Sequence, residues 1–219
     1  MTAPTYDTLT TDDTGADKIL TTGTVTALDQ NPVSIAQRGT DAPRVQVPVT
    51  DEKTSGTAAT WTIPAGVTAF KIAVQGGGGG SGGAGGASSV TYNSVTYTAN
   101  GGAQGVNGTL VAGGTASGGD RNITGQSGMG AATTVAGSSP FGAGGLAATG
   151  ADITDAGKGY GSGGALSTVA GVTSLAAAAG GTCYKRIAVV SGQTTATYTV
   201  GAGGTGTATG GGGLIIFEY

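Results

Sequence analysis

The chain has 219 residues and a net charge of −3, and only 10% of its residues are charged. It holds 47 glycines, six prolines, one cysteine and no histidine. Collagen is excluded, because it needs glycine at every third position and abundant proline. The few scattered cations and the missing histidine and cysteine clusters indicate no nucleic-acid partner, no metal and no cofactor.

Residues 1–57 differ from the rest, since they hold four of the six prolines and most of the acidic residues. Residues 20–28 suit a strand or a short helix, and a proline followed by a glycine predicts one or two helical turns over 33–38. Residues 42–49 suit extended chain. Such a segment cannot bury a core alone. We interpret it as an arm that attaches the protein to a partner or to sister copies; the alternative is a mobile tail.

The N-terminal residues show neither a basic start nor an apolar stretch, so no signal peptide is expected. No apolar run approaches the length that a membrane-spanning helix needs.

The second expected domain, residues 58–219, begins with a strand pattern. Over residues 60–75, Ile63 is followed by Phe70, Ile72 and Val74, and these last three alternate with Lys71 and Ala73, which is the period of a half-buried strand. A turn is expected at 64–66. Two hairpins follow from strand formers around turn residues, one over 90–98 and one over 185–200, and a last strand is expected over 214–219.

Glycine dominates the region between these strands: 42 of the 47 glycines lie in residues 76–219. The tracts have almost no strand or helix formers and fall at 76–86, 101–119, 125–130, 141–145, 157–164, 180–181 and 201–213. Polyglycine can form an extended helix with three residues per turn whose backbone groups bond to neighbouring helices. The strands at both ends favour such an ordered bundle over a disordered linker. Residues between the tracts are then expected as loops at its ends.

Few motifs suit chemistry. The glycines at 159, 161 and 164 match a nucleotide-loop pattern, but no strand–turn–helix unit surrounds them. Asp152 and Asp155 suit a hydrolase pair, a site for a hard cation or, most simply, a solvated polar loop. Cys183 has no histidine partner and is expected to be buried. The chain offers almost no paired carboxylates, so we expect no enzyme and no catalytic residue.

Aromatic, cationic and polar residues between the tracts suit a recognition surface, because tyrosine and arginine supply contact area on an adaptable backbone. For Tyr97 the alternative is packing on the β layer. The receptor-binding candidates are Tyr92, Asn93, Tyr97, Arg121, Asn122, Asp152, Asp155, Tyr184, Lys185 and Arg186.

Five motifs occur in order along residues 60–219: Trp61–Ile72 leading into glycines, Ser139–Gly145, Gly159–Gly164, Val200–Gly204 and Gly213–Tyr219. Together they resemble the glycine-rich C-terminal domain of bacteriophage tail-fibre and related virion proteins, including the distal adhesins of T-even-type phages. Residues 30–47 resemble a segment of phage fibre N-terminal regions.

The resemblance implies structural roles for Trp61, Phe141 and Tyr160, and it makes residues 88–98, 146–156 and 166–186 the receptor-facing loops. The fold expected is mainly β, with a small sandwich-like layer, a polyglycine-II region, long loops and little α-helix. The function expected is that of a tail-fibre or tail-tip protein on the virion surface, which binds a host glycan or outer-membrane protein.

Residues 1–57 are expected to join other virion proteins, with three copies assembled as in many fibres. The alternative is a structural capsid fibre, baseplate component or decoration protein without its own receptor.

Overall fold

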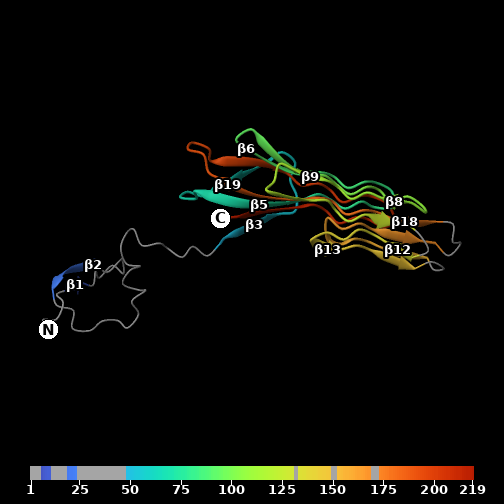
Figure 1. The fold of residues 1–219 in the computed structure, drawn as a ribbon, viewed down its shortest axis with the longest axis horizontal. Helices are drawn as coiled ribbons and strands as arrows, with labels where there is room; N and C mark the ends of the chain where they lie inside the picture. The colour runs from blue at the N-terminus through green and yellow to red at the C-terminus, as the bar shows by residue number, and fades with distance from the viewer. Residues whose placement is uncertain (1–5, 11–18, 24–47, 131–132, 149–151, 169–172) are drawn as a thin grey trace. The chain divides into compact units, whose positions relative to one another are not determined.

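The computed structural model describes residues 6–10, 19–23, 48–130, 133–148, 152–168 and 173–219 (Figure 1). The chain divides into two units, residues 1–47 and 48–219. In the first unit β1 (Tyr6–Thr10) pairs antiparallel with β2 (Ile19–Gly23). Of the two structures expected for residues 20–28, a strand or a short helix, residues 20–23 therefore form the strand. The helical turns expected over 33–38 lie outside the described residues.

The second unit starts about ten residues before the domain boundary expected at 57/58. The reason is β3 (Thr50–Lys53), which pairs with the C-terminal strand β21 (Leu214–Glu218) and completes a sheet. An Asp51 carboxylate oxygen also accepts a hydrogen bond from the Trp61 indole N–H at 3.0 Å. Residues 50–53 therefore belong to the folded body.

Two antiparallel five-stranded sheets share one hydrophobic core and form a β-sandwich. The first sheet has the order β10 (Arg121–Ile123), β19 (Thr182–Ala188), β5 (Ala69–Gln75), β21, β3. The second has the order β4 (Ala59–Thr62), β20 (Thr195–Thr199), β6 (Ser88–Tyr92), β7 (Val95–Ala99), β9 (Ala116–Ser117). The described residues contain no helix, and the sheets do not close into a barrel, so the mainly β prediction is confirmed.

Aromatic side chains fill the sandwich core. Trp61 stacks on Phe217 with ring centroids 4.1 Å apart, and Phe70 meets the edges of Trp61 and Tyr92. The alternation expected over residues 60–75 is confirmed in β5, where Phe70, Ile72 and Val74 are buried and Lys71 is exposed. The burial of these large apolar side chains stabilises the unit through the hydrophobic effect, which the glycine tracts cannot supply because they have no side chains.

The hairpin expected over 90–98 is confirmed as β6 and β7. Its turn residues, Asn93 and Ser94, have φ of 46° and 62°, as the tight turn of a two-residue hairpin requires.

The hairpin expected over 185–200 is wrong. β19 pairs with β5 and β10 in one sheet, whereas β20 pairs with β4 and β6 in the other. Each strand buries one face in the shared core, so residues 189–194 cross from sheet to sheet instead of closing a hairpin.

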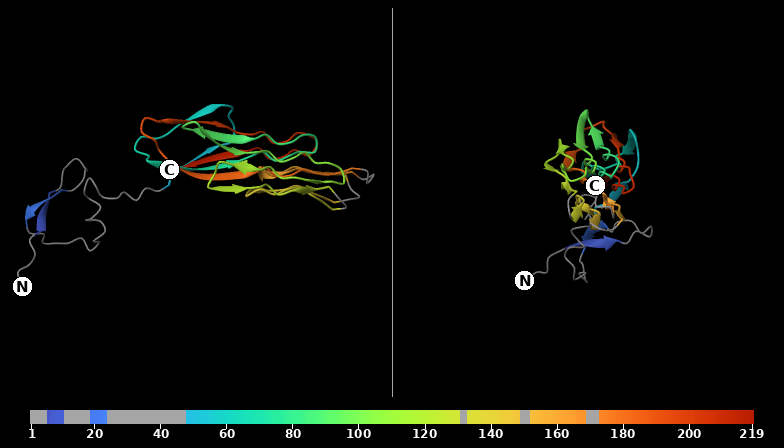
Figure 2. Two further views of the ribbon diagram at one scale, coloured as in Figure 1. Left: turned by 45° about the horizontal axis from the view of Figure 1, so that its top comes forward. Right: turned by 90° about the vertical axis from the view of Figure 1, so that its right-hand side faces the viewer.

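Beyond β5 the chain enters a bundle of extended glycine segments (Figures 1 and 2). Successive N–H groups of residues 76–80 donate in three directions with a period of three residues. The first and fourth donate to segment 178–181, the second and fifth to segment 83–86, and the third to Gly211, at 2.8–3.0 Å. Three residues per turn is the geometry of polyglycine II.

The carbonyl oxygens of the same segment accept hydrogen bonds from three further neighbours. These are segment 102–105, Gly164 and Gly204, at 2.7–3.1 Å. Residues 76–80 therefore have six hydrogen-bonded neighbours, which is hexagonal packing.

Residues 177–181 form a second such centre. Their six hydrogen-bonded neighbours are segments 161–164, 100–103 and 76–79 together with Gln126, Gly137 and Gly114. The backbone groups of both centres are thus satisfied without a ladder of conventional strands.

This packing explains the glycines. A Cβ atom on any residue from 76 to 80 would overlap a backbone carbonyl oxygen of a neighbouring segment. At the junction with the sandwich, buried Gln75 donates from Nε2 to the carbonyls of Gly76 and Gly180 at 2.9 and 3.0 Å, and its Oε1 accepts from the Thr182 hydroxyl. Gln75 therefore satisfies groups that the end of the bundle would otherwise leave without partners.

Short strands, rather than only loops, form much of the far end of the bundle, labelled β8, β12 and β18 in Figure 1. One sheet, which we call the tip sheet, has the order β14 (Leu146–Ala148), β12 (Thr133–Val135), β11 (Gly128–Met129), β8 (Leu110–Val111). Another has the order β15 (Ile153–Asp155), β17 (Ala165–Ser167), β18 (Ser174–Ala176). A separate pair, β13 (Phe141–Ala143) with β16 (Lys158–Tyr160), lies nearer the sandwich (Figure 1). Buried alanines at 136, 147, 165 and 176 form a second small core beneath the two sheets.

Candidate functional site

An apolar row crosses all four strands of the tip sheet. Leu146 lies opposite Val135, Val135 opposite Met129, and Met129 opposite Leu110. Their side chains are 58%, 44%, 50% and 62% exposed in that order. We call these four residues the tip row. Single exposed apolar residues are ordinary, but a contiguous row suggests a surface that another molecule covers.

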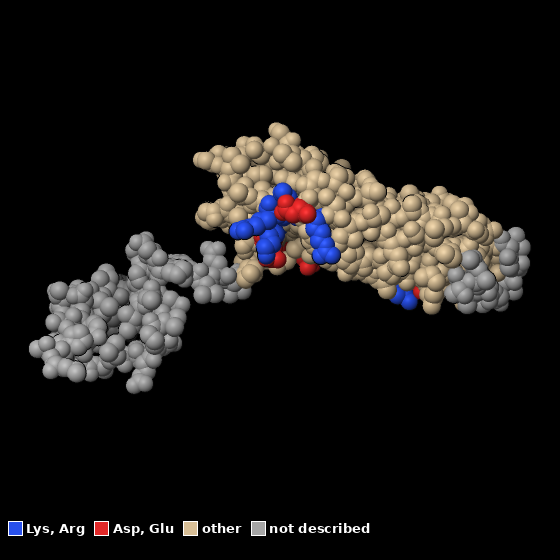
Figure 3. Space-filling view, in the orientation of Figure 1, with Lys and Arg blue, Asp and Glu red and all other residues tan. Residues whose placement is uncertain are grey.

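Charge is almost absent from this end of the unit. Of the 12 charged residues in 48–219, nine lie in or beside the sandwich strands: Asp51, Glu52, Lys53, Lys71, Asp120, Arg121, Lys185, Arg186 and Glu218. The other three are Asp152, Asp155 and Lys158. Figure 3 shows the same contrast between a cluster of charge on the sandwich and a nearly uncharged bundle. No described residue of the tip sheet is aromatic.

Asp155 has a structural role beside the tip sheet. Its carboxylate accepts the Leu146 N–H at 2.9 Å and lies 3.2 Å from the Lys158 ammonium group. The Leu146 N–H, and after it Lys158, hold the pKa of Asp155 below its ordinary value. Asp152 is exposed nearby. Among the described residues no three Asp, Glu, Cys or His side chains gather as a metal site would require.

Two sequence candidates lie in the core instead of on the surface. Tyr92 is 3% exposed, and its hydroxyl accepts the Val190 N–H at 2.7 Å; Tyr97 is 7% exposed. Both residues occupy alternate positions of the β6–β7 hairpin that face the first sheet. Neither tyrosine side chain is therefore available to contact a receptor. Of the candidates in this hairpin only Asn93, at the turn, is exposed.

The other candidates lie together at the β10–β19 edge of the sandwich, although the two strands are about 60 residues apart in the sequence. They are Arg121, Asn122, Tyr184, Lys185 and Arg186. Arg121 lies opposite Tyr184, and Asn122 opposite Cys183. Asp120 binds the Lys185 ammonium group at 2.5 Å and accepts the Arg186 backbone N–H at 3.0 Å.

Three side chains at this edge have shifted pKa values. The hydrogen bond from Lys185 lowers the pKa of Asp120, and Asp120 in turn raises the pKa of Lys185. Burial raises the pKa of Tyr184. Asn122 exchanges hydrogen bonds with the Gly119 backbone, so its side chain closes the turn before β10.

Trp61 and Cys183 are buried in the sandwich, as expected of a structural residue and an unreactive thiol. Burial raises the pKa of Cys183. Phe141 and Tyr160 lie opposite each other in the register of the β13–β16 pair.

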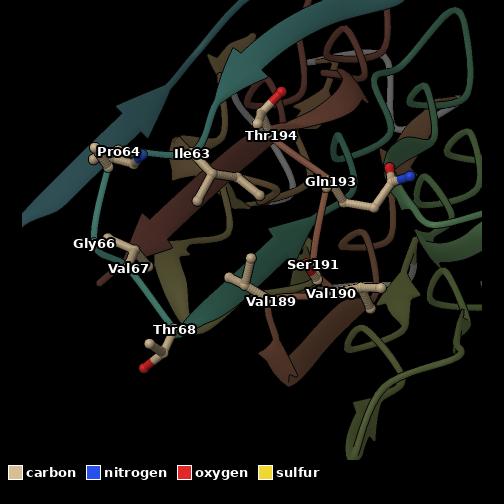
Figure 4. A pocket seen from close by; sticks show the side chains of 12 residues that line it. Ile63, Pro64, Gly66, Val67, Thr68, Val189, Val190, Ser191, Gln193 and Thr194 are labelled. Carbon is tan, nitrogen blue, oxygen red and sulfur yellow. The ribbon is translucent and has the colours of Figure 1, made fainter.

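A pocket of about 360 Å³ opens between residues 63–68 and 189–194 (Figure 4). Two hydrogen bonds close these loops into a ring, from the Ile63 N–H to the Thr194 carbonyl and from the Val189 N–H to the Thr68 carbonyl, both 2.8 Å. The lining has no titratable side chain, so the pocket suits an apolar group and not acid–base catalysis. Sequence reasoning missed both this pocket and the tip row.

Comparison with known protein families, with curated proteins and with solved structures found no match to this chain. Within the described residues no helix is long and apolar enough to cross a membrane.

Proposed function

We propose that the chain is a bacteriophage tail-fibre or tail-tip protein whose distal end binds the surface of the host cell. The observation that carries the proposal is the pairing of a polyglycine-II bundle with an exposed, almost uncharged tip row. A frame held by backbone hydrogen bonds in three directions keeps the tip strands in fixed positions, and preorganised contacts improve recognition.

The resemblance of the sequence motifs supports the proposal that this is a phage protein. The geometry of the second unit supports the tip as the surface that binds the host. Of the loops that the resemblance made receptor-facing, 146–156 contributes β14 to the tip sheet and β15 beside it, and 166–186 begins in β17 and β18, which contact the tip strands. Residues 88–98 and 182–186 lie in the sandwich at the other end of the bundle (Figure 1). The tip therefore becomes the proposed contact with a host outer-membrane protein or glycan. Residues 1–47, which come before the second unit, become the proposed attachment to the virion.

The test is binding of the purified full-length chain to a panel of bacterial strains. We expect the wild-type chain to bind some strains. The double variant Leu110→Asn/Leu146→Asn should lose at least tenfold in affinity for them, because it removes the two most exposed of the four apolar side chains in the tip row. Both positions are exposed, so folding is expected to be retained.

The matched control is Val49→Asn, an apolar position that is 49% exposed and lies directly before β3 of the sandwich. It should bind like the wild type. Binding to no strain, or equal binding by the tip variant, would remove the tip from the proposed function. The structural alternative, a decoration protein without a receptor, predicts that antibodies against the tip leave infection unchanged.

A further inference from the structure

The outer face of the first sandwich sheet is polarised by charge. One cross-strand row runs Glu52, Ile216, Ala73, Tyr184, Arg121 from β3 to β10, as the pairing registers place them. These side chains point away from the core, since their neighbours along each strand, such as Val74, Cys183 and Ile215, are buried. The row therefore has an acid at one end, a cation at the other and apolar or aromatic groups between.

The next row also has its acid on the β3 side and a cation on the β10 side, but the central strand between them carries Lys71 instead of an apolar residue. Glu218 on β21, Lys71 on β5 and Arg186 on β19 lie opposite one another, and Lys71 binds Glu218 at 2.6 Å. Arg186 extends the cationic half. No ion pair joins Arg121, Arg186 or Glu52 to another described residue, so the two ends of the face keep unpaired charges of opposite sign.

We infer that a second copy of this chain docks on this face, with the cationic half of one copy against the acidic half of the other. A half-turn about an axis along the strands brings Arg121 opposite Glu52 of the second copy and Tyr184 opposite its Ile216. An apolar centre with a charged rim is the usual anatomy of a protein interface, and self-complementarity is what symmetric association requires.

The charge pattern favours this occupant over others. A uniformly acidic or basic partner would find only half of the face complementary, whereas a sister copy supplies both signs in the required order. This association does not depend on the host-binding role, because it is measured on the purified chain without cells.

The test is crosslinking of the full chain carrying Glu52→Cys and Arg121→Cys. Packed sheets lie about 10 Å apart, beyond the reach of a disulfide, so a bismaleimide of about that length is the reagent. The native Cys183 is buried and should not react. We expect covalent dimers from the double variant, because the half-turn closes the contact at two copies, and monomers from each single variant. The matched control Glu52→Cys/Lys158→Cys, with the second thiol on β16, should also remain monomeric.

Any assembly held by residues 1–47 alone would leave the crosslink absent, and that result would overturn the inference. A second measurement covers the case in which the thiol variants pack poorly. Arg121→Glu should weaken self-association in analytical ultracentrifugation by roughly tenfold or more, and adding Glu52→Arg should restore it. Association unchanged by Arg121→Glu, or not restored by the swap, would contradict the docking.

Discussion

At the scale of single residues, the bundle depends on positions that have no side chain. The tip depends on contacts such as the hydrogen bond from the Leu146 N–H to the Asp155 carboxylate. Gly78 shows the first dependence most directly. Its N–H donates to the Gly211 carbonyl and its own carbonyl accepts the Gly204 N–H, while a Cβ atom would overlap the Ser162 carbonyl oxygen. Gly212 lies in the same bundle, yet a Cβ there would meet nothing within 4 Å. The same substitution should therefore destabilise the protein at Gly78 and have little effect at Gly212.

We expect Gly78→Ala to lower the free energy of unfolding by ~1–3 kcal/mol or more, because an extra methyl group in a close-packed interior forces the backbone apart. Gly212→Ala should be neutral within ~0.5 kcal/mol. Chemical denaturation of both variants checks the difference. Equal stability of the two would mean that the segments do not pack as closely as the hydrogen bonds indicate.

Asp155 gives a residue-scale prediction about pH. Its pKa is lowered in the folded state, chiefly by the Leu146 N–H, so its contribution is present above the unfolded pKa of about 4 and is lost as the pH falls through the lower folded value. Acidification below about pH 4 should therefore release the Leu146 amide, seen as a change in its NMR shift. Asp155→Asn should abolish that titration and Asp152→Asn should keep it. If the NMR shift of the Leu146 amide titrates in Asp155→Asn as it does in the wild type, the Asp155 carboxylate is not the group that binds this amide.

At the scale of elements, the sequence predicts strands wherever side chains alternate. The β5 pattern and the Asn93–Ser94 turn follow from residue types alone. The partners of β19 and β20 do not, because an apolar strand suits either sheet of a sandwich and only tertiary packing decides between them. For the same reason Tyr92 and Tyr97 look like surface aromatics until the opposing sheet is present to bury them.

The tip row was not predictable for a different reason. Its four residues come from strands of two or three residues, which are too short to show a periodicity. Glycine tracts also have no side chains to set a register, so the sequence indicates a bundle without indicating which tract lies beside which. Those neighbours are fixed only by the full set of backbone hydrogen bonds.

At the scale of the second unit, sandwich and bundle share chain segments and hydrogen bonds, so they should behave as one cooperative body. β5 continues directly into segment 76–80, segment 177–181 continues directly into β19, and Gln75 bonds to both segments at the junction. A disordered glycine linker would instead exchange its amide hydrogens as fast as an unstructured peptide.

We expect amides of 76–80 and 177–181 to be protected to the same extent as those of β5, because all are bonded inside one unit that opens only by global unfolding. Hydrogen exchange followed by mass spectrometry on the full chain measures this. Rapid exchange confined to the glycine segments, with β5 still protected, would show that the sandwich folds without the bundle and would leave the tip without its frame.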